Sequence, residues 1–425
     1  MRVLWFTNGP CGAIKKLTGN EVTGGGWLYA LSQAIRIHTE IELHIAFYWK
    51  CEMASFEYEG ITYHPILRNG SGSKIGRYIY RLKQQFQKNV DDLEIERCLK
   101  VYRNINPDIV HFHGSEENFG HIAQHIDNTK CVLSIQGMLS PYYYKLYSGI
   151  QKYDALRSEP LLSKLMFDGY DAQAKRLKNR AELEIVRLKS IPNILGRTNW
   201  DRDCTIAINP ERRYFTCNEI LRAEFLNSRW EKKNKDQRIV LCTTVSYGLY
   251  KGLEMVYETA NLLTFANINF EWNVIGIANG DKYASLVQKV TSILPHNVHI
   301  NLMGRKTASQ MIDIFRSSDC FVQVSHIENS PNSLCEAMVL GMPIIASNAG
   351  GTSSLLEDGK DGILVQDGDP FRLAGAIINM SKNYEQAVLM GKTAREKALI
   401  RHNPQNVINE LLTAYRVICS NTSAI

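Results

Sequence analysis

The chain has 425 residues, of which 44% are hydrophobic and 22% are charged, so it can bury substantial cores and is neither disordered nor of low complexity. This length favours two globular domains. The 49 basic and 43 acidic residues leave a net charge of +6, which is weak for a dedicated nucleic-acid binder but compatible with anionic small molecules or membrane surfaces. We therefore expect no nucleic-acid partner.

Ten cysteines are scattered without a Cys-x-x-Cys pair and without histidines at zinc-ligand spacing, as in a reduced cytoplasmic protein. The apolar residues 1–6 resemble an opening buried strand and lack the length of a secretory signal. The longest apolar tract, 337–346, is interrupted by glycine and proline and is shorter than the roughly 20 residues that span a bilayer. The sequence therefore predicts a cytoplasmic protein.

Short runs rich in Val and Ile alternate with longer helix-like segments, the pattern of a parallel sheet with helices on both faces. Each half of the chain is expected to form one doubly wound α/β unit. The predicted strands are 2–6, 42–47, 109–112, 132–135 and 193–195 in the first half, and 239–243, 271–275, 298–302, 320–324, 343–347 and 362–365 in the second.

Residues 227–238 are polar and charged and lack apolar periodicity, as is typical of a surface linker. We therefore predict an N-terminal domain over 1–215, a linker over 216–237 and a C-terminal domain over 238–403. An Asn-Pro pair suits a helix start, so a last helix with one apolar face is predicted over 404–425.

The most informative segment is 325–343, in which a strand end, a polar loop and a helix follow one another. Glu328 is expected in the loop at the carboxyl edge of the sheet, where open parallel sheets bind ligands, and Glu336 in the first helical turn. Both carboxylates can accept hydrogen bonds from sugar hydroxyls. The helix start can face a phosphate with backbone N–H groups from Asn332, Ser333 and Leu334. Alternatively, Ser333 and Glu336 form a capping box.

Glu328 and Glu336 are separated by seven residues and followed by Ala-Met-x-x-Gly-x-Pro-Ile-Ile-Ala-Ser and then Ala349-Gly350-Gly351. This string resembles the donor-nucleotide motif of retaining glycosyltransferase family 4, which are GT-B enzymes related to glycogen and sucrose synthases. The resemblance implies a GT-B fold with two Rossmann-like domains facing across a cleft and a C-terminal helix crossing back to the first domain. Further strings, 111–116, 134–138, 196–201 and 218–222, resemble a subgroup found with bacterial surface-polysaccharide pathways.

The resemblance implies transfer of a hexosyl group from a nucleotide diphosphate sugar to a saccharide or lipid-linked saccharide, with retention, in lipopolysaccharide or capsule synthesis. In the family's proposed same-face displacement, the departing phosphate helps to deprotonate the acceptor, so no carboxylate becomes a covalent intermediate. Since lysine and helix termini can handle the diphosphate charge, and no Asp-x-Asp occurs in these motifs, neither a metal nor a cofactor is expected.

Lys251-Gly252-Leu253 is similar to the family's Lys-Gly element, in which the lysine neutralises the diphosphate. By the same resemblance, Glu336 binds the ribose hydroxyls and Glu328 binds hydroxyls of the donor sugar. A cation at Lys251 would stabilise the charge that grows on the leaving phosphate. An isolated Lys-Gly would instead be an ordinary solvated lysine.

The family usually carries an arginine five residues before that lysine, but this chain has Ser246 there. Arg305, or Arg197 from the other domain, is the candidate to supply the missing cation. Arg197 is equally expected to be a stacked, ion-paired structural residue beside Trp200 and Asp201.

In the first half, Gly25 and Gly26 open a helix after the first strand, where glycines allow backbone N–H groups to approach a phosphate or sugar. A glycine cluster is also typical of a flexible turn. His113 and Gln136 each follow an apolar strand and therefore reach the same sheet edge. Many relatives have histidine at the position of Gln136, and we expect this residue to help hold the sugar.

Residues 68–88 include six basic residues and no acidic one, interleaved with apolar residues at helical spacing. Such a segment can rest on an anionic membrane, which would make the protein peripheral at the inner face of the cytoplasmic membrane. Alternatively, it is a solvated helix face that covers its own domain.

Two other functions fit the same architecture. Ser246 in place of arginine motivates a catalytically silent sugar-nucleotide-binding protein, and the other alternative is a GT-B epimerase of sugar nucleotides. The donor sugar, its base, the acceptor, the linkage and the oligomeric state stay open at this point.

Overall fold

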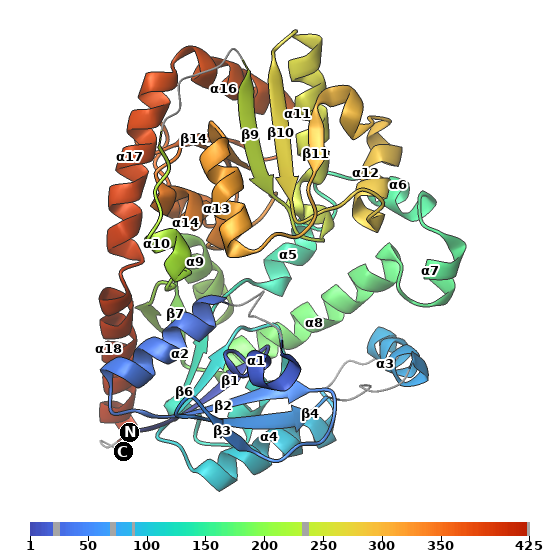
Figure 1. Cartoon of the computed structure of the whole chain (residues 1–425). Coiled ribbons are helices and arrows are strands. Elements are labelled where there is room, and N and C mark those ends of the chain that lie inside the picture. Colours follow the sequence, from blue (N-terminus) through green and yellow to red (C-terminus); the bar gives the residue numbers. More distant parts are fainter. Residues whose placement is uncertain (20–25, 69–73, 87–89, 232–237, 423–425) are drawn as a thin grey trace. The chain divides into compact units, whose positions relative to one another are not determined.

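The computed structural model describes residues 1–19, 26–68, 74–86, 90–231 and 238–422 (Figure 1). The chain forms two compact units. Unit 1 comprises Met1–Tyr143, Leu161–Ile220 and His402–Ile425, and unit 2 comprises Tyr144–Pro160 and Leu221–Arg401. The sequence placed all of 1–215 in the first domain, whereas residues 144–160 belong to unit 2.

Unit 1 contains an eight-stranded sheet in the order β3-β4-β2-β1-β5-β6-β7-β8. All neighbouring strands are parallel except β3 and β4, which pair antiparallel. The predicted central strands are present, and β3, β4 and β8 were not predicted. The strands are β1 (Arg2–Thr7), β2 (Glu42–Trp49), β3 (Phe56–Tyr58), β4 (Ile61–Leu67), β5 (Ile109–His113), β6 (Cys131–Ser134), β7 (Asn193–Gly196) and β8 (Arg213–Thr216).

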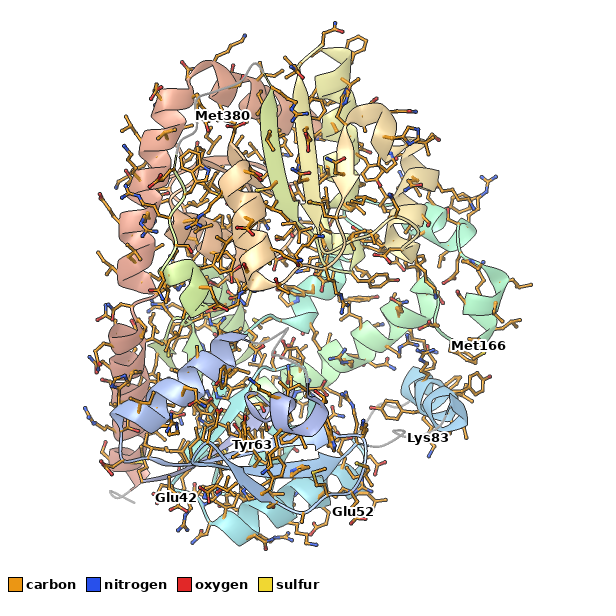
Figure 2. The ribbon with its side chains drawn as sticks, in the orientation of Figure 1. Glu42, Glu52, Tyr63, Lys83, Met166 and Met380 are labelled. Carbon is orange, nitrogen blue, oxygen red and sulfur yellow. The ribbon has the colours of Figure 1, made fainter. Side chains whose placement is uncertain are left out.

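Alternate strand residues of unit 1 enter two separate apolar clusters, because successive side chains of a strand point to opposite faces. Val3 and Trp5 join one cluster with α2 and α18, and Leu4 and Phe6 join the other with α4. Tyr63 lies in the first cluster (Figure 2). The helices are α1 (Ala13–Thr18), α2 (Gly26–His38), α3 (Lys74–Phe86), α4 (Asp92–Ile105), α5 (Leu139–Lys145, which continues into unit 2), α7 (Leu161–Leu165), α8 (Tyr170–Ser190), α9 (Asn199–Ile208) and α18 (Pro404–Thr422).

Unit 2 contains an all-parallel six-stranded sheet in the order β11-β10-β9-β12-β13-β14. All six strands expected in this half are present, although the one predicted over 298–302 begins only at residue 300, after a 3-10 turn at Pro295–Val298. The strands are β9 (Ile239–Thr244), β10 (Phe270–Ile275), β11 (Ile300–Leu302), β12 (Cys320–Gln323), β13 (Ile344–Asn348) and β14 (Ile363–Gln366).

Because the strands of unit 2 are parallel, all their carboxyl ends lie at one edge, where the connecting loops meet. In Figure 1 the arrowheads of β9 and β10 point to the same end of the sheet. The helices of this unit are α6 (Lys152–Arg157), α10 (Ala223–Leu226), α11 (Leu253–Phe265), α12 (Lys282–Thr291), α13 (Ala308–Ser317), α14 (Asn332–Leu340), α15 (Thr352–Leu355), α16 (Pro370–Lys382) and α17 (Tyr384–Arg401).

The expected surface linker is in part packed structure. Trp230 is buried, its backbone N–H donates to the carbonyl of Leu340, and its indole N–H donates to the carbonyl of Ser318. A single large aromatic residue therefore anchors a stretch whose overall composition is polar. Residues 232–237 of the same stretch lie outside the described residues.

The ten cysteines are all free thiols. Among the helices that the structure describes, none is long and apolar enough to cross a membrane.

Candidate functional site

Lys251 and Glu328 come together at the carboxyl edge of the unit 2 sheet. Lys251 ends a 3-10 turn after β9, and Glu328 lies in the loop after β12. The lysine Nζ is 2.6 Å from Glu328 Oε1, which also accepts a hydrogen bond from Ser325 Oγ at 3.0 Å. Both charged side chains are largely buried. The structure therefore brings together two of the residues that the resemblance assigns to donor binding.

Two glycines with left-handed backbones allow the loops around this pair to pack. Gly252 has φ +75°, and a Cβ there would overlap the carbonyl of Val324. Gly350 has φ +58°, and a Cβ there would overlap the backbone carbonyl of Glu328, which accepts a 2.8 Å hydrogen bond from Gly351 N–H. Only glycine combines this backbone conformation with so close an approach. The Lys-Gly and Ala-Gly-Gly strings therefore fix where Lys251 and Glu328 lie.

Lys251 is held as a cation in spite of its burial. Burial favours the neutral amine, but the Glu328 carboxylate and Tyr250 outweigh it, so the pKa of Lys251 lies above its ordinary value. The pair can therefore offer an ammonium group to a bound anion.

Helix α14 begins beside this pair with two unsatisfied backbone donors. The N–H groups of Asn332 and Ser333 have no acceptor within the described part of the chain. The N–H of Leu334 donates to the carbonyl of Pro331 at 3.0 Å. Leu334 was expected to be a third free donor, and that expectation is wrong because the first turn closes as a 3-10 turn on Pro331.

Glu336 does not cap the helix. Since α14 starts at Asn332, Glu336 lies in the second turn, not the first, and its buried carboxylate receives two 2.8 Å hydrogen bonds from Nε and Nη2 of Arg222. The guanidinium also lies 4.6 Å from the ring centre of Phe225. Burial raises the pKa of Glu336, while Arg222 acts against that rise. The capping-box alternative is therefore wrong, and Arg222 is a partner that sequence reasoning missed.

Arg305 lies exposed in the loop between β11 and α13, at the same sheet edge. It makes no hydrogen bond or ion pair with any other described residue. Ser246, where relatives carry an arginine, is also exposed. The use of Arg305 as the replacement cation stays a prediction.

A charge network centred on the buried His326 was not predicted. The ring of His326 is 2.5 Å from Glu254 Oε1 through Nε2 and 2.6 Å from Asp367 Oδ1 through Nδ1, and Lys145 Nζ lies 2.8 Å from Asp367 Oδ2. Burial lowers the pKa of His326, but the hydrogen bonds to Asp367 and Glu254 outweigh it and raise this pKa to about 9. The network therefore holds an imidazolium.

This network is hydrogen-bonded to the loops that carry Lys251 and Glu328. The backbone N–H of His326 donates to the carbonyl of Tyr250, which precedes Lys251, and His326 stands two residues before Glu328. No sequence signal joined its members, because they lie at positions 145, 254, 326 and 367, and their types are common on protein surfaces.

In unit 1, His113 ends β5 and is fully buried. Its ring stacks on His111, with centroids 3.8 Å apart, and meets Trp5 edge-on at 4.3 Å. Neither ring nitrogen has a hydrogen-bond partner among the described residues. Burial, with smaller effects from His111 and Arg197, holds the pKa of His113 well below its ordinary value, so the ring is neutral.

Arg197 follows β7, and its side chain contacts other residues of unit 1. Its guanidinium lies 3.5 Å from Glu219 Oε2 and 4.3 Å from the ring centre of Trp27. This side chain is therefore stacked and ion-paired, as the structural alternative expected, and Trp27 and Glu219 are among its partners. Asp201 accepts a hydrogen bond from the backbone N–H of Arg197.

The remaining candidates of unit 1 are less informative. Gln136 follows β6 and is partly buried, and Gly26 is the first residue of α2. Gly25 lies outside the described residues.

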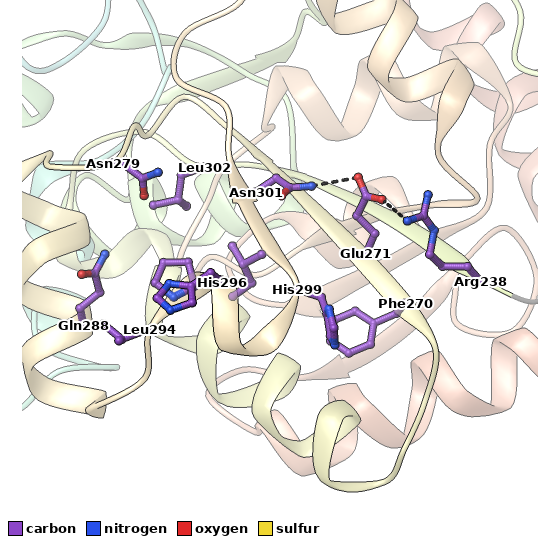
Figure 3. A pocket seen from close by; sticks show the side chains of 12 residues that line it. Arg238, Phe270, Glu271, Asn279, Gln288, Leu294, His296, His299, Asn301 and Leu302 are labelled. Carbon is purple, nitrogen blue, oxygen red and sulfur yellow. Dashed lines mark hydrogen bonds and ion pairs between the residues drawn. The ribbon is translucent and has the colours of Figure 1, made fainter.

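A separate cavity of about 770 Å³ lies along the edge strand β11 (Figure 3). Glu271 is central in its lining, between Asn301 at 2.9 Å and Arg238 at 2.8 Å. None of the predicted site residues lines this cavity. It is therefore distinct from the Lys251–Glu328 pair.

Two α/β units whose sheets are largely parallel are the architecture of a GT-B fold. Solved structures agree. The chain matches sucrose-phosphate synthase from Thermosynechococcus elongatus with a TM-score of 0.70 and 13% identity, covering 99% of this chain and 100% of that one. It matches Anabaena HepE, solved with UDP and glucose, with a TM-score of 0.61 and 13% identity over 100% of both chains. The expected GT-B fold is thereby confirmed.

Sequence comparison matches part of the chain to a family. Residues 225–397 match the family described as "Glycosyl transferases group 1". An uncharacterized glycosyltransferase of Methanocaldococcus jannaschii is 25% identical over 228 residues, 49% of this chain and 63% of the relative. The amylovoran biosynthesis glycosyltransferase AmsK of Erwinia amylovora is 27% identical over 169 residues, 38% of this chain and 40% of the relative. The chain thus spans less than two thirds of either relative.

Proposed function

We propose that the protein is a retaining hexosyltransferase of glycosyltransferase family 4, which moves a hexosyl group from a nucleotide diphosphate sugar to a saccharide or lipid-linked saccharide. The observation that carries the proposal is the 2.6 Å contact between Lys251 and Glu328, at the sheet edge where α14 begins with two free N–H groups. This site lies within the segment that matches group 1 glycosyltransferases.

The pair explains how a donor would be received. The ammonium of Lys251 binds the diphosphate, which replaces Glu328 as its partner. Glu328 is then released to accept hydrogen bonds from donor-sugar hydroxyls. The N–H groups of Asn332 and Ser333 complete the phosphate site, since a helix start favours anions.

Glu336 binds the ribose hydroxyls in this proposal. Its two oxygens each accept one hydrogen bond from Arg222, and each retains a further lone pair for a hydroxyl. Arg222 would thus keep a buried carboxylate available to the ribose without a large rearrangement.

Catalysis follows from where charge develops. As the glycosidic bond breaks, negative charge grows on the departing phosphate, and Lys251 and the α14 donors stabilise that charge more than the ground state. The same phosphate oxygen accepts the proton of the attacking hydroxyl on the same face of the sugar, which retains the anomeric configuration. No metal or cofactor takes part.

The acceptor is assigned by class only. The match to an amylovoran biosynthesis glycosyltransferase supports a role in surface polysaccharide synthesis. His113, at the end of β5, and Gln136, after the neighbouring strand β6, are proposed to contribute to sugar binding there.

The test is turnover by the purified protein against a panel of nucleotide sugars, chosen first by thermal stabilisation. Lys251→Ala is expected to lower the rate about 100-fold or more, because one transition-state cation is lost. The matched control, Lys382→Ala, removes an exposed lysine of α16 and should leave the rate unchanged.

The outcomes separate the alternatives. Nucleotide binding without transfer or donor hydrolysis would identify a catalytically silent binding protein. Interconversion of free sugar nucleotides would identify an epimerase. A wild-type rate in Lys251→Ala would contradict the proposed role of this lysine.

A further inference from the structure

Helix α7 exposes nearly all of its apolar side chains. Leu161, Leu162 and Leu165 are 72%, 70% and 63% exposed, Met166 directly after the helix is 43% exposed, and no residue of α7 is buried. Isolated exposed leucines are ordinary, but several in one and a half turns of helix are not. Packing within unit 1 therefore does not explain why α7 is apolar.

Helix α3 extends this apolar surface. Tyr78 of α3 lies 6.0 Å from the ring of Phe167, just after α7, and Arg81 of α3 pairs with Asp168 at 3.4 Å. Phe86 is 70% exposed, with Lys175 Nζ 4.7 Å from its ring centre. We call the result the α3–α7 surface, and its exposed apolar members are Ile79, Phe86, Leu161, Leu162, Leu165 and Met166.

For residues 68–88 the sequence left two alternatives open, contact with an anionic membrane or a solvated helix face that covers its own domain. The described part of this segment, α3, has features of both. Gln85 is buried and donates to the carbonyl of Ala172, so one side of α3 covers its own unit through α8. Ile79 and Phe86 on the same helix are exposed. Residues 69–73 and 87–89 lie outside the described residues. The contribution of α7 had no counterpart in the sequence prediction.

The charges around the α3–α7 surface are mainly basic. Lys83, Lys164, Lys175 and Lys178 are exposed, and the sequence of α3 contains no acidic residue. Of the nearby carboxylates, Asp168 is paired with Arg81, and Asp171 at the start of α8 is exposed. Figure 2 shows Met166 and Lys83 on the same side of unit 1.

Exposed apolar side chains on the same elements as exposed lysines fit an anionic lipid surface. We propose that unit 1 docks on an anionic bilayer through the α3–α7 surface, with the leucines of α7 entering the interfacial region and the lysines meeting headgroup phosphates. A second copy of the chain fits less well, because a symmetric contact would bring the same lysines together. The docking is independent of the proposed transfer reaction.

The experiment is co-sedimentation of the full chain with phospholipid vesicles. We expect binding to phosphatidylcholine vesicles that contain about a third phosphatidylglycerol, and little binding to phosphatidylcholine alone or at high salt. The double variant Leu162→Asp/Leu165→Asp and the double variant Lys83→Glu/Lys164→Glu are each expected to bind about tenfold or more weakly.

Matched control variants lie on unit 2. Phe371→Asp replaces a side chain that is 73% exposed on α16, and Lys382→Glu reverses an exposed charge on the same helix. Both should bind vesicles as the wild type does. All replaced residues are exposed, so an unchanged thermal unfolding midpoint confirms that each variant is folded.

Three outcomes would overturn the proposal. The first is no binding of the wild type to anionic vesicles, and the second is binding that the variants of the α3–α7 surface leave unchanged. The third is a wild-type dimer that the Leu162→Asp/Leu165→Asp variant converts to a monomer, which would assign this surface to a second copy.

Discussion

Arg222, which is partly exposed, and the buried Glu336 form a bidentate pair whose members are separated by 114 positions in the chain. Breaking such a pair costs more than the pair itself contributes, because the remaining charge loses its partner while it stays out of water. The pair therefore has a structural consequence that can be measured without any substrate.

Arg222→Ala is expected to lower the free energy of unfolding of unit 2 by about 3 kcal/mol, because it strands the Glu336 carboxylate. Chemical denaturation of the variant measures this. The control is Arg238→Ala, which removes an arginine that pairs with Glu271 but is 54% exposed and should cost less than about 1 kcal/mol. Equal costs for the two variants would contradict the buried-pair interpretation.

His326 makes the stability of unit 2 depend on pH. Its pKa is raised from 6.5 to about 9 by Asp367 and Glu254, so the stabilisation is complete below pH 6.5 and is lost as the pH rises through about 9. His326→Gln should therefore be less stable than the wild type near neutral pH, on the order of 3 kcal/mol, and the gap should close in alkali. Thermal unfolding across this pH range tests it.

The control for this titration is His296→Gln, which changes an exposed histidine of the same unit. Its difference from the wild type should stay small at every pH. A gap for His326→Gln that is the same at neutral and alkaline pH would show that the imidazole is not held as a cation.

At the scale of single residues, the sequence predicted the Lys251–Glu328 part of the site and missed Arg222 and the His326 network. Lys251 and Glu328 were predictable because each belongs to a string of neighbours that resembles a known motif. Arg222 ends the string 218–222, to which no role was assigned. The other members of the His326 network come from α5, α11 and the loop after β14, so no local pattern connects them. Long-range charge pairing leaves no periodic signal in a sequence.

At the scale of elements, the loops of unit 2 depend on glycine for two separate reasons. Gly252 and Gly359 have nearly the same φ, +75° and +74°. A Cβ at Gly252 would overlap the Val324 carbonyl, whereas one at Gly359 would meet nothing within 4 Å. An alanine at Gly359 would therefore cause backbone strain alone, whereas an alanine at Gly252 would cause backbone strain and steric overlap.

Gly252→Ala is expected to weaken donor binding about tenfold or more, because the overlap displaces the Lys251 turn from the 324–328 loop. Gly359→Ala carries only the left-handed backbone cost of about 1 kcal/mol and should bind donor normally. Calorimetric titration with the nucleotide sugar found in the turnover panel measures both. If donor affinity falls equally in both variants, the loss is caused by backbone strain and not by displacement of the Lys251 turn.

The strands that sequence reasoning missed are β3 and β8, at the two edges of the unit 1 sheet, and β4, which pairs with β3. Central parallel strands are buried on both faces and appear as continuous apolar runs, which the sequence shows clearly. In contrast, β3 and β8 end the unit 1 sheet and are only partly buried, and β4 contains Pro65. Their half-exposed side chains interrupt the apolar run that the prediction relied on.

At the scale of the whole molecule, the chain passes between its units four times, near residues 143, 160, 220 and 401. Length and the alternating apolar runs could predict two units, and the family resemblance implied the late return to the first. Neither could predict that 144–160 joins unit 2, since Lys145 reaches Asp367 through one ion pair and Gly149 fits only because it has no side chain there.

A fragment containing only 221–401 should therefore be less stable than one to which a peptide of residues 144–160 is added. A Cβ at Gly149 would overlap Glu254 and His326, so the same peptide with Gly149→Val is the matched control and should not stabilise the fragment. Thermal unfolding with increasing peptide concentration measures the effect. A fragment that is equally stable with and without the wild-type peptide would show that 144–160 contributes nothing to unit 2.

Helix α18 supplies Val407, Leu411 and Tyr415 to the cluster that contains Trp5, and the Trp5 indole donates to the Tyr415 hydroxyl across 410 positions of sequence. On the ribosome, β1 therefore emerges long before the helix that covers it. Residues 221–401 of unit 2 are synthesised in between and can fold while one side of the first sheet still exposes apolar side chains. Nascent chains at this stage are the ones that we expect chaperones to recognise.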